Sequence, residues 1–197
     1  MKRLAASTVL SVWACATAGS GSAPPGADRP KGPAISDYVR LDVGSRRTYR
    51  MRFLGQEGER TVQVVGTDDG WVVDDQGGAF RITEDGLRDR ERYLIRTPLE
   101  PGTTWRSVLG ASAVERYRIA SVGAPCQVAA GRFSDCLVVE GRLRRDPRMT
   151  LRLEWTWIRG VGLGRIESWA VVDGETRPAT TQELVAYDLS AADGTTP

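Results

Sequence analysis

The stretch TLRLEWTWI, residues 150–158, alternates polar and apolar side chains through its first eight positions. The apolar positions are Leu151, Leu153, Trp155 and Trp157, and the positions between them carry hydroxyl or charged groups. Successive side chains of a β-strand point to opposite faces, so a period of two predicts a strand with one packed face and one solvated face. Such a strand is typical of an antiparallel sheet.

The same period recurs along the chain, at residues 48–53, 92–96 and 136–144. Short polar runs such as Asp68-Asp69-Gly70 and Asp173-Gly174 separate the periodic stretches, and runs of this composition form turns. No stretch shows a sustained helical period. We therefore predict an all-β fold of about ten strands, mostly up-and-down, that forms a single curved antiparallel sheet or a partial β-barrel.

The N-terminal segment has the organisation of a secretory signal peptide. Met1-Lys2-Arg3 is positively charged, and residues 4–14 form an uncharged stretch that is too short to span a bilayer as a helix. The stretch Val12-Trp13-Ala14-Cys15 resembles the lipobox of bacterial lipoproteins, which implies cleavage before Cys15 and lipidation of its thiol. The alternative is cleavage after Ala14-Cys15-Ala16, an A-x-A site that yields a soluble secreted or periplasmic product.

The lipobox-like stretch also predicts a location and a division of the chain. Residue 16 is Ala rather than Asp, and by resemblance to Gram-negative lipoproteins this implies transfer to the outer membrane, with the domain facing the periplasm. We predict a signal peptide at 1–14 and a lipidated Cys15 with a flexible Gly/Ser/Ala/Pro tether at 15–36. A β domain follows at 37–189, and a disordered tail occupies 190–197.

Composition excludes several classes of chemistry. Of the 27 basic residues, Lys2 and Arg3 lie in the signal peptide, and the other 25 match the 25 acidic residues, so the near-neutral mature chain argues against a nucleic-acid partner. The chain has no histidine, which excludes Ser-His-Asp triads, Cys-His pairs and His-based metal sites. We predict no catalytic residue, no cofactor and no metal. The alternative is a carboxylate-based hydrolase acting on an envelope glycan, with two carboxyl groups roughly 5–5.5 Å apart in a cleft if it is a retaining enzyme.

The other two cysteines, Cys126 and Cys136, enclose the stretch CQVAAGRFSDC. Gly131 between them can turn the chain, so a hairpin can bring the two thiols together in a compartment where a disulfide persists. Closing a loop of about eleven residues contributes about 2.8 kcal/mol to stability on the chain-entropy model. Catalytic disulfides typically have Cys-x-x-Cys spacing, so we predict a structural bridge.

Four aromatic residues are candidates for ligand contacts. One hypothesis is that Tyr117, Trp155, Trp157 and Trp169 line the concave face of the sheet and hold a lipid or another apolar small molecule. The interpretation that we favour is that these side chains only fill the core. A further alternative is an envelope-structural module that contacts an envelope protein through an exposed apolar patch. The sequence thus predicts a non-enzymatic binding or structural module, joined to the membrane by its lipid anchor.

Four pieces of the chain carry a resemblance to a known family; they are LDVGSRRTYR at 41–50, PLEPGTTW at 98–105, APCQVAAGRFSDCLVVEG at 124–141 and WIRGVGLGRIES at 157–168. They resemble the recurrent pieces of an uncharacterised family of secreted bacterial β-sheet proteins and lipoproteins. The resemblance implies fold and location but no activity, and Arg47 stands where that family often has Trp. The first two pieces also resemble each other, which predicts that they open two similar halves of the sheet.

Overall fold

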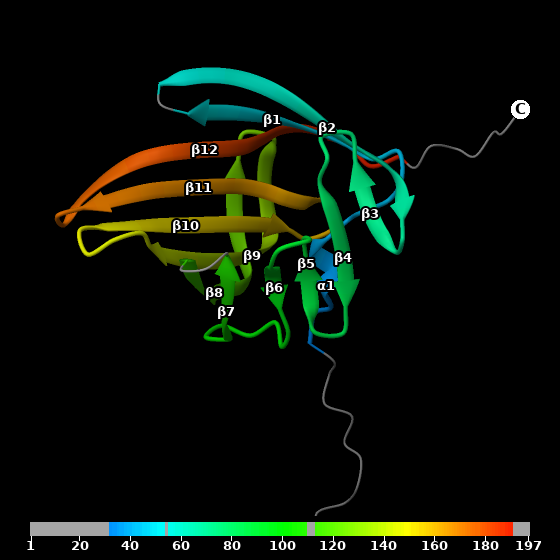
Figure 1. The fold of residues 1–197 in the computed structure, drawn as a ribbon. Coiled ribbons are helices and arrows are strands. Elements are labelled where there is room, and N and C mark those ends of the chain that lie inside the picture. The colour runs from blue at the N-terminus through cyan, green and yellow to red at the C-terminus, as the bar shows by residue number, and fades with distance from the viewer. Residues whose placement is uncertain (1–31, 54, 110–112, 191–197) are drawn as a thin grey trace, which may run out of the picture. The chain divides into compact units, whose positions relative to one another are not determined.

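The computed structural model describes residues 32–53, 55–109 and 113–190. The predicted signal peptide, Cys15, most of the predicted tether and residues 191–197 of the predicted tail lie outside the described residues. One short helix and twelve strands make up the described part (Figure 1): α1 (Ile35–Tyr38), β1 (Arg46–Phe53), β2 (Gln56–Asp68), β3 (Trp71–Asp74), β4 (Ala79–Thr83), β5 (Gly86–Arg88), β6 (Tyr93–Arg96), β7 (Thr104–Leu109), β8 (Ala113–Val128), β9 (Gly131–Arg144), β10 (Met149–Ile158), β11 (Gly162–Val172) and β12 (Glu175–Asp188).

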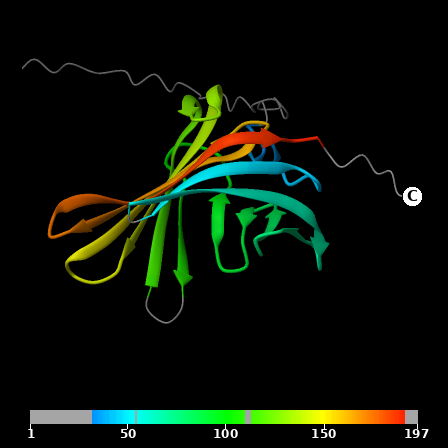
Figure 2. The ribbon, with the colours of Figure 1, turned by 90° about the horizontal axis from the view of Figure 1, so that it is seen from above.

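All twelve strands belong to one antiparallel sheet that is nearly closed into a barrel, in the order β6-β5-β4-β3-β2-β1-β12-β11-β10-β9-β8-β7. Every neighbouring pair is also adjacent in sequence except β1 and β12, which lie side by side in Figures 1 and 2. The prediction of an all-β, mostly up-and-down sheet is therefore confirmed. The sheet has twelve described strands rather than about ten because β3 to β5 are only three to five residues long, too short to show a clear alternation.

The two edge strands, β6 and β7, approach each other where the barrel nearly closes. The indole Nε1–H of Trp105 on β7 donates a 3.0 Å hydrogen bond to the carbonyl oxygen of Tyr93 on β6. Arg92, just before β6, forms a 2.6 Å ion pair with Glu115 on β8, whose carboxylate is buried. Side chains rather than a backbone ladder thus join the two edges.

The predicted similarity between two halves of the sheet has a structural counterpart at the starts of β1 and β7. Gly44 and Gly102 both have positive φ, 90° and 95°, a conformation that favours glycine. The backbone N–H of Gly44 donates to Val64 on β2, and that of Gly102 donates to Ile119 on β8, each at 2.8 Å. The return bonds, from Val64 and Ile119, go to the residue after each glycine. Arg47 lies three residues after Gly44, and Trp105 lies three residues after Gly102, so the two residues occupy equivalent positions in the two halves.

Helix α1 packs against one part of the barrel. Ile35 and Tyr38 are buried in a core that includes Trp105, Ile119 and Leu137. Ile35 falls within the range expected for the tether, so ordered structure begins before residue 37 because this apolar side chain reaches the core. The tyrosine hydroxyl donates a 2.6 Å hydrogen bond to Asp135 on β9. Burial and that carboxylate raise the pKa of Tyr38 to about 12.

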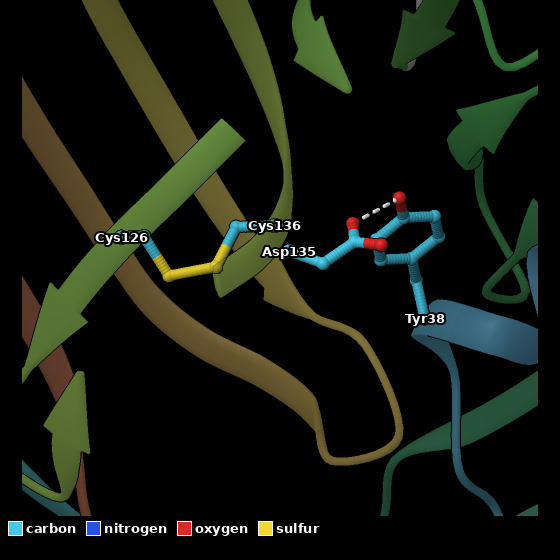
Figure 3. The surroundings of a disulfide bond; sticks show 4 residues. All are labelled: Tyr38, Cys126, Asp135 and Cys136. Carbon is cyan, nitrogen blue, oxygen red and sulfur yellow. Dashed lines mark hydrogen bonds between the residues drawn. A yellow bond between two sulfur atoms is a disulfide. The ribbon is translucent and has the colours of Figure 1, made fainter. Parts of the chain in front are cut away.

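A disulfide joins Cys126 on β8 to Cys136 on β9, with the two Cα atoms 6.0 Å apart (Figure 3). The predicted pairing is therefore present. Cys136 is fully buried, and Asp135 beside it is the residue that holds Tyr38. Arg159 binds Asp135 and Asp37 at 2.8 and 2.7 Å, so the same corner attaches α1 to the sheet by three charged side chains.

A stack of three aromatic rings from β7, β8 and β10 crosses the core of the second half of the sheet, the half that begins with β7. The Tyr117 ring lies between Trp105 and Trp155, with ring centroids 5.4 and 5.2 Å away. Gly141 is the direct partner of Tyr117 on the neighbouring strand, and the tyrosine ring covers it so closely that a Cβ at this position would lie 2.6 Å from a ring carbon. Burial and the neighbouring Glu115 raise the pKa of the Tyr117 hydroxyl, which donates a hydrogen bond to that carboxylate.

No helix in the described residues is long and apolar enough to cross a membrane.

Candidate functional site

The interior of the barrel contains a cavity of about 420 Å³ between the two halves of the sheet. Its walls are mostly aliphatic and aromatic side chains, among them Val62, Val72, Phe80, Leu153 and Ile166. These five side chains are only partly buried although they lie on the inner side of the sheet, so solvent reaches the cavity. Small-molecule sites have similar size and lining, at roughly 300–1,000 Å³ with a few polar groups among apolar ones.

Two carboxylates line the cavity, and both are committed to local structure. Asp74 accepts hydrogen bonds from the backbone N–H groups of Gln76 and Gly78, at 2.9 and 2.7 Å. Asp89 accepts hydrogen bonds from the backbone N–H groups of Glu91 and Arg92, at 2.8 and 2.7 Å. These carboxylates shape turns at the cavity wall, as aspartate side chains commonly do.

Arg47 is the exceptional polar group of the cavity. Its side chain comes from β1 and is buried, with only 7% of the residue exposed. The guanidinium donates to the carbonyl oxygens of Val161 and Arg40, at 2.9 and 2.6 Å, and more weakly to the Ser45 hydroxyl at 3.4 Å. All three acceptors are neutral. Within the described residues no carboxylate lies within 4 Å of Arg47.

The charge of Arg47 is therefore buried without an ionic partner in the described residues. Burial lowers the pKa of the guanidinium, but an arginine stays protonated in a protein. A buried charge is costly unless it is paired, so this cation favours an anion beside it. The guanidinium has five N–H groups, and three of them make the bonds described above, which leaves two donors for such an anion.

A second donor lies in the cavity wall. Trp157 is 6% exposed, and its indole Nε1 is buried without a hydrogen-bond partner among the described residues. An indole N–H usually finds a partner when it is buried. The wall thus presents two donor side chains, Arg47 and Trp157, within a mostly apolar lining that also includes Arg40, Arg92, Gln182 and the two aspartates.

The structure separates the four aromatic residues expected to line the concave face. Trp155 and Trp157 line the cavity. Tyr117 lies in the aromatic stack behind it and contacts the cavity only through Trp155. Trp169 is paired with the exposed Arg152 on the outer face of the sheet, and the guanidinium lies 5.8 Å from its ring centroid.

Sequence reasoning missed Arg47 as a site residue. In the alternation at 48–53 it has the parity of Tyr49 and Met51, so the period of two already indicated that Arg47 points inward and Arg46 outward. A second signal was the match between the two halves of the chain, in which Arg47 takes the place of Trp105.

No metal-binding group of three or more Cys, Asp or Glu side chains occurs in the part of the chain that the structure describes.

Comparisons with known proteins give little further information. No protein-family model matches the chain, and no curated protein matches it. Among solved structures, one described as a putative lipoprotein from Parabacteroides distasonis is similar over 79% of this chain and 100% of its own, with 11% sequence identity and a TM-score of 0.43. A similarity this distant carries no inference about what the present chain binds or does.

Proposed function

We propose that this protein is a lipid-anchored envelope protein that binds an amphiphile with an apolar body and an anionic head in the interior cavity. The observation that carries the proposal is Arg47, a buried cation without an ionic partner in the described residues, in the wall of a mostly apolar cavity. The apolar walls would contact the body of the ligand, and the two remaining N–H groups of Arg47 would bind its carboxylate or phosphate.

The ligand preference can be tested with one compound and its neutral derivative. We expect a long-chain carboxylate to bind at least about tenfold more tightly than its methyl ester, because a hydrogen bond to a charged group contributes about 1.5–3 kcal/mol. Arg47→Gln should bring this ratio close to one, whereas Arg47→Lys keeps the positive charge and should keep part of the preference. Arg46→Gln is the matched control, because Arg46 is the adjacent residue and is exposed.

The site itself can be located by tryptophan quenching. A brominated chain bound in the cavity should quench Trp155 and Trp157, so replacing both with Phe should remove most of the quenching. Trp169→Phe should leave the quenching unchanged because this residue lies on the outer face. Equal affinity for carboxylate and ester, or quenching that depends on Trp169, would contradict the proposed site.

The anchor part of the proposal rests on the N-terminal sequence around Cys15. Several acyl chains hold a protein stably on a membrane, whereas one chain binds only marginally. Cys15→Ser should therefore move the protein from the membrane fraction to the soluble fraction without changing its melting temperature. If the Cys15→Ser protein still sediments with membranes, lipidation of Cys15 is not what anchors it.

A further inference from the structure

The outer face of the second half carries four arginines in one row across the sheet. Arg106 on β7 is the direct partner of Arg116 on β8. Arg116 is also opposite Arg142 on β9, and Arg142 is opposite Arg152 on β10. All four side chains are exposed. With about 4.8 Å between neighbouring strands, the row extends about 14 Å perpendicular to the strands. We call these four residues the arginine row.

The arginine row is not neutralised within the described part of the protein. None of its four members forms an ion pair there, although ten other arginines do. Like charges directly opposite each other on paired strands are destabilising, and the row contains three such pairs in succession. The near-neutral total charge of the chain conceals this local concentration of positive charge. An arrangement that costs stability in the isolated domain is explained if an anion binds to it.

A row of opposite sign runs beside the arginine row. Glu140, Glu154 and Glu167 are direct partners on β9, β10 and β11, two residues along each strand from the level of the arginines. Arg118 forms a 2.8 Å ion pair with Glu140 at the end of this glutamate row. Burial and the neighbouring Glu167 raise the pKa of Glu154.

The surface at the start of the two rows is hollowed. A depression of about 550 Å³ is lined by Arg106, Arg116 and Arg142 from the arginine row, and by Arg118 and Glu140 from the neighbouring row. At the other end of the arginine row, Trp169 is opposite Arg152 and presents a partly exposed ring. The arginine row therefore begins in a depression at β7, crosses the outer face to β10, and ends beside an aromatic ring on β11.

We propose that the arginine row binds a linear acidic polysaccharide, with the anionic groups of successive sugars along the arginines. The guanidinium fork suits carboxylate and sulfate groups, and ionised glutamates accept hydrogen bonds from sugar hydroxyls. A flat anionic membrane would cover both rows at once and bring its charges against three glutamates. A nucleic acid has fewer hydroxyls for those carboxylates, and single-stranded recognition needs several aromatic platforms for the bases. This proposal is independent of the interior cavity.

The test compares affinities of the full chain for defined polymers at low salt. A polyuronate with one carboxylate on every sugar is expected to bind, and the same polymer with its carboxylates esterified is not. Arg116→Gln/Arg142→Gln removes the middle of the row and should weaken polyuronate binding about tenfold, since each exposed charge pair contributes modestly. Arg46→Gln/Arg60→Gln is the matched control; it removes the same charge from exposed positions on β1 and β2 and should change affinity less than twofold.

Three results would overturn the proposal. The first is no binding of the polyuronate, and the second is an equal loss of affinity in the two double variants, which would indicate only a net-charge effect. The third is tighter binding of a single-stranded oligonucleotide or of vesicles containing anionic lipid than of the polyuronate. Thermal melting separates these results from misfolding, because removing like-charge neighbours should leave the melting temperature of Arg116→Gln/Arg142→Gln unchanged or raised.

Discussion

Replacing Gly141 with alanine tests the aromatic stack at the centre of the second half. The backbone of Gly141 does not have a positive φ, so an alanine meets no conformational penalty there. Its Cβ, however, would lie 2.6 and 2.8 Å from two carbons of the Tyr117 ring and 3.2 Å from the Cβ of Leu153. Carbon atoms in contact are normally about 3.5 Å apart, so the ring must withdraw by about 0.9 Å.

The ring of Tyr117 has little freedom to withdraw. Trp105 and Trp155 lie against its two faces, and its hydroxyl is bound to Glu115. Overpacking of a well-packed core costs about 1–3 kcal/mol, and the locked ring favours a value near 2 kcal/mol. For a chain of this length, 2 kcal/mol lowers the melting temperature by about 4–8 °C. Gly58→Ala is the control, since its Cβ would meet nothing within 4 Å and its φ is not positive, so it should be neutral or slightly stabilising.

The assay is thermal and urea unfolding of both variants, combined with a double-mutant cycle. In a Tyr117→Leu background the ring is absent, so Gly141→Ala should cost much less than in the native sequence. The near-ultraviolet circular dichroism of Gly141→Ala should also change, because the stacked rings must shift. If Gly141→Ala melts within about 1 °C of the native protein, or costs as much in the Tyr117→Leu background, the contact between ring and glycine does not limit the packing.

Three further predictions concern covalent, acid–base and electrostatic contributions to stability. Cys126→Ser should lower the free energy of unfolding by about 2–4 kcal/mol, and an unchanged urea midpoint would show that the disulfide contributes nothing. Stability should fall as the pH rises from about 10 towards 12, because tyrosines ionise in the unfolded chain while the fold keeps them protonated. The fold raises the pKa of Tyr38 to about 12 and also raises that of Tyr117. Melting curves at increasing pH should therefore show a smaller loss of stability for Tyr38→Phe than for the native protein. Arg142→Gln removes two like-charge contacts, with Arg116 and Arg152, and should raise stability by a few tenths of a kcal/mol at low salt, a gain that high salt abolishes if the reasoning is right.

The sequence predicts the long strands well because their period of two directly reflects one packed and one solvated face. The stretch from Thr150 to Ile158 lies within β10, with Trp155 and Trp157 inward, as the alternation indicates. The disulfide was predictable because a hairpin with a glycine turn leaves few alternative partners for Cys126. The short strands β3 to β5 were not predictable, since three to five residues cannot establish a period, whereas β6 lies in the alternating stretch at 92–96.

Register and facing direction account for what the sequence could not predict at the candidate sites. β11 has apolar residues at both parities, so the sequence does not show that Ile166 faces inward while Trp169 faces outward. The arginine row depends on which residues are opposite one another in four strands. Irregularities in β8, such as the shift between Ile119 and Ser121, change that register without a clear signal in the sequence.

The pairing of β1 with β12 determines when the fold can be completed as the chain emerges from a ribosome or a translocation channel. Arg46 is opposite Asp188, 142 positions later, so β1 must wait for almost the entire domain to appear. During that interval β1 and β11 each have an edge that another chain could pair with, and contacts between such distant segments form slowly. A chain cut short before Glu175 would therefore lose more than one strand, because its two groups of strands would have no ladder left to join them.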